Sequence, residues 1–123
     1  MKATVVRAVN AGFVSADLEI AAPVGREVLV DVKASGLCHT DLTMSKFDLG
    51  VPFPAVFGHE VAGVVAEIGP DVVELAVGDH VVGCLVQYCG ACMKCLSGKV
   101  FQCLHPESTL RADRKSTRLN SSH

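Results

Sequence analysis

Four cysteines crowd into the short stretch YCGACMKCLSGKVFQC, with the spacing C-x2-C-x2-C-x7-C. They are Cys89, Cys92, Cys95 and Cys103. The residues between the thiols offer little from which a hydrophobic core could form, so the thiols themselves must organise this part of the chain. Three arrangements would do so: disulfides, an iron–sulfur cluster, or a closed zinc site.

The spacing and the predicted compartment favour zinc. The N-terminus, MKATVVRAVNAG, carries an Arg inside its only apolar run, so it does not resemble a secretory signal. We therefore expect a cytoplasmic protein, in which thiols stay reduced and disulfides are rare. In ferredoxin-type clusters the fourth Cys usually follows after three residues and precedes a Pro, whereas here the gap is seven and Leu104 follows. Four thiolates suit a tetrahedral structural zinc ion. Zinc is the prediction, with the other two arrangements as alternatives.

Length and charge exclude several classes of function. A chain of 123 residues forms one domain at most. Its formal net charge is −2, and its basic residues cluster only near the C-terminus, so we expect no nucleic-acid partner. No apolar stretch approaches the ~18 residues of a membrane span, so we expect no membrane insertion.

Alternating apolar and polar residues predict a mainly β fold. Val28, Val30, Val32 and Ala34 share one face of a strand predicted over 27–36. Further strands are predicted over 3–9, 17–23, 60–69 (interrupted at Gly63) and from about Asp79, and one short helix over 38–47. Short strands separated by Gly and Pro at these intervals are typical of a small, irregular β-barrel.

A second group of metal-binding residue types lies upstream of the four cysteines. Cys38 stands where a predicted strand meets the predicted helix, and the helical N–H dipoles there favour its thiolate form. His59 and Glu60 enter a later strand between Gly58 and Gly63. One Cys and one His are two of the three protein ligands of a catalytic zinc. Taken alone, the pair is also compatible with ordinary packing roles.

Three motifs in order give this pair a context. GLCHTD is followed by GHEVAGVVAEIGPDV, which fits G-H-E-x2-G-x5-G-x2-V, and then by the four-cysteine segment. The chain over 1–112 thereby resembles the N-terminal half of the zinc-dependent medium-chain alcohol dehydrogenases. The resemblance implies a GroES-like β-barrel with short helices and a zinc-binding lobe.

The family resemblance assigns the metal ligands. Cys38 and His59 resemble two ligands of the catalytic zinc, and Glu60 resembles a carboxylate that can approach the metal. Asp41 resembles the group that hydrogen-bonds the ligating His and so fixes its tautomer. The four cysteines of the lobe match the ligands of the structural zinc. The third catalytic ligand of the family, a Cys, has no match; Cys84, in the apolar run HVVGCLV, is expected to lie in the core.

Other positions imply roles in proton transfer and cofactor binding. Thr40 matches the hydroxyl that takes the alcohol proton, and His39 occupies the position of a basic residue that faces the cofactor pyrophosphate. Family members often carry a His three positions after the hydroxyl, but this chain has Thr43 there. We therefore expect the proton to leave through water or the cofactor ribose.

The implied function is oxidation of an alcohol to an aldehyde or ketone, with hydride transfer to NAD and two Zn²⁺ ions, one catalytic and one structural. The partner would be a small-molecule alcohol or aldehyde, and the full-length protein a homodimer or homotetramer. Two other functions are alternatives: a non-catalytic, co-chaperonin-like binding module, because the family's N-terminal domain is GroES-like, and an iron–sulfur electron carrier.

The C-terminal residues have a different character. The stretch 113–123, DRKSTRLNSSH, is polar and basic and resembles a translated sequencing adapter. We therefore interpret 1–112 as an incomplete catalytic domain and 113–123 as an adapter-derived tail. No glycine-rich dinucleotide fingerprint occurs in the sequence. The nucleotide-binding Rossmann domain is thus expected to be absent, and the fragment to be inactive.

Overall fold

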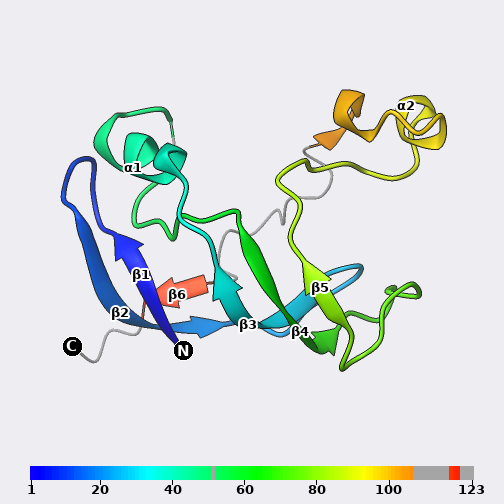
Figure 1. The fold of residues 1–123 in the computed structure, drawn as a ribbon, viewed down its shortest axis with the longest axis horizontal. Coiled ribbons are helices and arrows are strands. Elements are labelled where there is room, and N and C mark those ends of the chain that lie inside the picture. Colours follow the sequence, from blue (N-terminus) through cyan, green and yellow to red (C-terminus); the bar gives the residue numbers. More distant parts are fainter. Residues whose placement is uncertain (51, 107–116, 120–123) are drawn as a thin grey trace.

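The computed structural model describes residues 1–50, 52–106 and 117–119, and these form two small antiparallel sheets with short helices (Figure 1). The elements in chain order are β1 (Lys2–Val6), β2 (Phe13–Ile20), β3 (Val28–Ser35), α1 (His39–Lys46), β4 (Val61–Ile68), β5 (His80–Val82), α2 (Met93–Leu96), the 3₁₀ helix η1 (Val100–Gln102) and β6 (Thr117–Leu119). The prediction of a mainly β fold is confirmed. Among the described residues, no helix has the length and apolar character needed to cross a bilayer.

The first sheet has the strand order β1-β2-β6. β1 ends at Val6 and not near residue 9, because Asn10 and Gly12 adopt positive φ values of 58° and 76° and turn the chain into β2. The second strand therefore begins at Phe13, four residues before the predicted start. β6 pairs with β2. The rest of the predicted tail lies outside the described residues, so its adapter-derived origin stays a prediction.

The second sheet, β3-β4-β5, contains the sequence motifs that flank the candidate site. β3 and β4 pair antiparallel from Val28 opposite Ile68 to Ser35 opposite Val61. A register shift between Val32 and Ala34 lies next to Gly63, where an added β-carbon would stand 2.4 Å from the carbonyl oxygen of Asp31. The predicted irregularity at Gly63 is thus confirmed, because only glycine permits the two strands to approach this closely.

The core is small and built from small side chains. Among the residues whose burial is described, its buried hydrophobic side chains are Val5, Val6, Leu18 and Val65. The apolar face predicted for β3 is only partly buried, since Val32 is 53% exposed. The register shifts in β3 interrupt the strict alternation on which that prediction rested.

Backbone hydrogen bonds fasten α1 and the loop after it to the first sheet. The Asn10 N–H donates to the Ser45 carbonyl at 2.7 Å, near the C-terminal end of α1. Val6 and Ala55 exchange two hydrogen bonds of 2.9 Å each. These bonds fix the loop that leads to His59, so the positions of α1 and His59 are set by the same sheet.

Candidate metal centres

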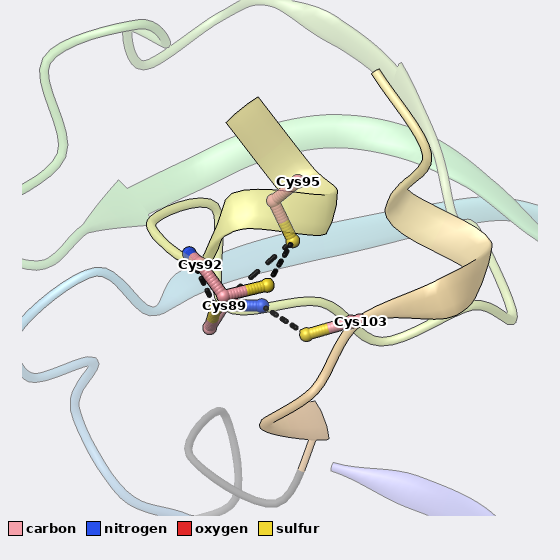
Figure 2. A group of neighbouring side chains, drawn as sticks. All are labelled: Cys89, Cys92, Cys95 and Cys103. Atoms are coloured by element: carbon pink, nitrogen blue, oxygen red, sulfur yellow. Dashed lines mark hydrogen bonds between the residues drawn. The ribbon is translucent and has the colours of Figure 1, made fainter. Parts of the chain in front are cut away.

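The four-cysteine lobe, residues 89–103, lies beyond the end of β5 and well apart from α1 (Figure 1). Cys95 lies on α2, and Cys103 directly follows η1. Gly90 and Gly98 have positive φ values of 75° and 77°, which turn the chain sharply on either side of α2. Figure 2 shows the four side chains gathered in one place, although the last ligand is separated from the others by η1.

The sulfur positions fit a tetrahedral zinc ion. All four Sγ atoms lie within 4.8 Å of one another. Cys95 Sγ lies 4.0 Å from Cys89 Sγ and 3.5 Å from Cys92 Sγ. Zn–S bonds of about 2.3 Å in a tetrahedron would place two sulfurs about 3.8 Å apart. All six cysteines are free thiols in the structure, and these separations are far longer than the ~2.0 Å of a disulfide.

Backbone N–H groups surround the sulfurs and favour thiolates. Cys92 N donates to Cys89 Sγ, and Cys89 N donates to Cys103 Sγ, both at 3.3 Å. The backbone N–H groups of Leu104 and Cys95 lower the pKa of Cys92 to about 6. Desolvation raises the pKa of Cys95 to about 12. A divalent cation would bring these divergent thiols into the same deprotonated state, because metal coordination favours the thiolate.

The antiparallel pairing of β3 with β4 assembles the second centre. Because the end of β3 faces the start of β4, Cys38 after β3 comes close to His59 and Glu60 before β4. The ligand atoms of these three residues lie within 4.8 Å of one another. Residues 21 positions apart in the sequence are therefore brought together by strand register, as the resemblance implied.

Asp41 meets His59 from the buried side of α1. Asp41 is only 6% exposed, and its Oδ1 lies 3.3 Å from His59 Nδ1. A buried carboxylate is costly unless it is paired, and His59 provides the partner. With Nδ1 directed at Asp41, the other ring nitrogen remains available as a metal ligand. A hydrogen bond with Cys38, followed by the nearby Asp41 charge, raises the pKa of His59.

Thr40 contacts the candidate thiolate ligand directly. Its Oγ1 lies 3.0 Å from Cys38 Sγ. The hydroxyl of Thr40, then its backbone N–H and His59, lower the pKa of Cys38 and so favour the thiolate. The family resemblance implies a proton-transfer role for Thr40 but not this contact with sulfur. The C-x-T order in GLCHTD was the available signal, since the side chain of an N-cap residue lies near the residue two positions later.

The predictions for His39 and Cys84 have different outcomes: the first stays untested and the second is wrong. His39 is exposed at the start of α1, and its Nδ1 lies 3.4 Å from Thr43 Oγ1. It is not among the three side chains that converge, and its proposed contact with a cofactor stays a prediction. Cys84, expected in the core, is exposed. The reason is that β5 ends at Val82, so the apolar run HVVGCLV does not continue as a buried strand.

Asp41→Asn is expected to weaken divalent-metal binding at the Cys38–His59 centre by about 10- to 100-fold, the usual cost of losing a partner of a ligating His. Titration of Co²⁺ into the chain, after zinc has filled the lobe, would measure this by visible absorption. Asp48→Asn is the control, because Asp48 is exposed, accepts a hydrogen bond from Gly50 N and lies outside both candidate centres. Unchanged affinity in Asp41→Asn would show that Asp41 does not orient the ligand.

Comparison with known proteins agrees with this geometry. The family described as "Alcohol dehydrogenase GroES-like domain" matches residues 25–114. The chain is 41% identical to an NDMA-dependent alcohol dehydrogenase from Amycolatopsis methanolica, over 83% of this chain and 28% of that protein. It is 43% identical to an S-(hydroxymethyl)glutathione dehydrogenase from Paracoccus denitrificans, over 71% of this chain and 24% of the relative.

Solved structures give the same result. An alcohol dehydrogenase zinc-binding domain protein from Burkholderia ambifaria matches with a TM-score of 0.81 and 43% identity, covering 96% of this chain and 33% of that one. Benzyl alcohol dehydrogenase from Acinetobacter calcoaceticus matches with a TM-score of 0.76 and 41% identity, covering 94% and 32%. The chain thus spans about a quarter to a third of the length of these relatives. The GroES-like fold inferred from the motifs is confirmed, and the chain belongs to the alcohol dehydrogenase GroES-like domain family.

Proposed function

We propose that this chain is part of a longer cytoplasmic, zinc-dependent alcohol dehydrogenase that oxidises a small alcohol to an aldehyde or ketone by hydride transfer to NAD. The observation that carries the proposal is the convergence of Cys38, His59 and Glu60 within 4.8 Å. Thr40 and Asp41 each contact one member of this group. The names of the relatives, which are alcohol dehydrogenases, support the same class of substrate.

The two centres differ in the charge that they offer to a cation. The lobe presents four thiolates, whereas Cys38 and Glu60 supply two negative charges and His59 a neutral nitrogen. A closed set of four thiolates suits a structural ion, and the second set leaves room for substrate. A zinc ion held by Cys38 and His59 would supply Lewis acidity, which lowers the pKa of a hydroxyl bound to it.

The chain's own residues would help to remove the proton from the substrate hydroxyl, so that the carbon bearing it can lose a hydride. Asp41 holds the imidazole of His59 in one tautomer, and Thr40 holds the Cys38 thiolate by a hydrogen bond. Thr40 Oγ1 is the hydroxyl nearest the candidate thiolate ligand among the contacts described above. We therefore assign it to accept the proton of the alcohol while its own O–H, turned away from Cys38 Sγ, gives a proton to water or the cofactor ribose.

The remaining parts of the reaction are assigned to residues outside this chain. The glycine-rich dinucleotide fingerprint and the family's third ligand, a Cys, have no match in the sequence. We therefore expect the chain by itself to show no turnover. In the longer enzyme, NAD would be bound mainly by the second domain, with His39 facing its pyrophosphate, and the enzyme would assemble as a homodimer or homotetramer.

Metal analysis of the longer gene product tests the proposal. We expect about two zinc ions per chain and NAD-dependent oxidation of alcohols. Cys38→Ser should remove one zinc ion together with the activity, because it removes a ligand from the second centre alone. Retention of dehydrogenase activity after exhaustive chelation would refute the proposal, as would acid-labile sulfide in place of lobe zinc.

A further inference from the structure

Gly36 marks the closest approach of the chain after β3 to the side chain of Glu60. The Gly36 N–H donates to the Glu60 carbonyl at 2.8 Å, which continues the pairing of β3 with β4 by one residue. A β-carbon added to Gly36 would lie 1.9 Å from Glu60 Oε2, 2.9 Å from Glu60 Cβ and 3.0 Å from Glu60 Cδ. The carboxylate therefore lies over the backbone of Gly36, in space that the first carbon of any other side chain would fill.

The requirement for glycine at position 36 comes from this contact and not from the backbone. Several glycines of the chain have positive φ, including Gly12, Gly58 and Gly90, but Gly36 does not. An alanine could adopt the backbone conformation of Gly36 without the strain of the left-handed region. What it could not do is leave room for the Glu60 side chain in its present rotamer.

The position of the carboxylate matters because of what lies beside it. A Glu60 oxygen lies within 4.8 Å of the ligand atoms of both Cys38 and His59. Glu60 itself is exposed, so its other rotamers lead into solvent. Holding a long side chain in one rotamer costs conformational entropy. The space above Gly36, which Glu60 occupies, favours the rotamer that places the carboxylate next to the other two ligand atoms.

We propose that Gly36 is a positioning residue, whose missing side chain forms a slot that keeps the Glu60 carboxylate beside Cys38 and His59, where it can act as an additional donor for a divalent cation. The inference rests on the proposed metal centre. It gives a role to Gly36, a residue of the GLCHTD segment that has no ligand atom of its own, and it explains how an exposed carboxylate stays near the other two ligand atoms.

Cobalt binding to the 123-residue chain tests the proposal without requiring activity. Zinc first fills the lobe, and Co²⁺ is then titrated while visible absorption reports the second centre. We expect Gly36→Ala to weaken Co²⁺ binding by about 10-fold, because the displaced carboxylate no longer reaches the ion. Glu60→Ala should weaken it to a similar extent, and Gly36→Ala should add no further loss in the Glu60→Ala background.

The matched control is Gly83→Ala. Its added β-carbon would lie 2.5 Å from Val61 Cγ1, so it introduces a clash with the first residue of β4, directly after Glu60, but not with the carboxylate. We expect Gly83→Ala to lower stability in thermal unfolding and to leave the Co²⁺ affinity unchanged. Circular dichroism establishes that each variant is folded before titration.

If Gly36→Ala does not fold, Glu60→Asp carries the test. It keeps Gly36 and shortens the side chain by one methylene, so the carboxylate no longer spans the slot, and the same ~10-fold loss is expected. Wild-type affinity in a folded Gly36→Ala or in Glu60→Asp would overturn the proposal. So would an equal effect of Gly36→Ala with and without the Glu60 carboxylate.

A Cys38→Ser chain separates this inference from the proposed function. If the wild-type cobalt spectrum disappears in Cys38→Ser, the metal centre exists, and the Gly36 variants then decide the role of the slot alone. If the wild-type chain shows no cobalt binding that depends on Cys38, both the proposed metal centre and the positioning role of Gly36 are refuted.

Discussion

Removal of the zinc ion that we propose for the four-cysteine lobe is expected to unfold residues 89–103 while β3 and β4 stay paired. The largest apolar side chains of the lobe are exposed and give it no core of its own: Met93 is 79% exposed, Leu96 76% and Phe101 69%. A structural zinc ion contributes on the order of 10 kcal/mol or more of folding free energy, which no contact within this segment can replace. The loss of folded structure should therefore be confined to residues 89–103 and nearly complete there.

Hydrogen exchange would resolve this local unfolding. After chelation, the amides of Leu96 and Gly98, which bond to the Cys92 and Cys95 carbonyls, should lose their protection. The amide of Val65, which donates to the Asp79 carbonyl beside β5, should keep its protection from exchange. Cys92→Ser should reproduce the effect of chelation, and Cys84→Ser should not, because Cys84 is exposed and lies outside the cluster. If the lobe amides stay protected in Cys92→Ser, a structural metal ion is not what holds the lobe folded.

The fold could be predicted from the sequence where local pattern and backbone chemistry agree. The alternation in 27–36 predicted β3 closely, and Gly63 predicted the irregular pairing of β3 with β4. The boundary between the first two strands was wrong, because it depends on the positive φ of Asn10 as well as Gly12, and Asn adopts that conformation only in some contexts. The short helices α2 and η1 were missed because thiol spacing, and not apolar periodicity, determines the lobe.

For the candidate site, the sequence predicts which residues come together but not which of them are buried. The identities of Cys38, His59 and the four lobe cysteines followed from spacing and family resemblance, and the structure brings each set together. Burial could not be read from the same patterns: the apolar surroundings of Cys84 in the sequence predicted a core position, yet it is exposed. α1 likewise buries the polar Asp41 and Ser45, because position against His59 and the first sheet outweighs hydrophobicity.

In the longer dehydrogenase that we propose, Thr40→Ala is expected to lower turnover by about 10²- to 10⁴-fold, the usual effect of losing a group that transfers a proton. Zinc content should change little. Thr40 Oγ1 stabilises the Cys38 thiolate at 3.0 Å, but a bound cation stabilises that thiolate far more strongly than a hydroxyl does. Steady-state kinetics and metal analysis on the same preparation would measure both quantities.

Thr40→Ser and Thr43→Ala complete this test. Thr40→Ser keeps a hydroxyl within reach of Cys38 Sγ, so most of the turnover should return. Thr43 is a matched control on the next turn of α1, where its hydroxyl bonds to the His39 carbonyl at 3.2 Å and not to Cys38. Because Thr43 has no assigned proton-transfer role, Thr43→Ala should leave turnover within a few-fold of wild type. If Thr40→Ala lost zinc and turnover in equal proportion, its hydroxyl would serve to hold the Cys38 ligand, and the proton of the alcohol would need another acceptor.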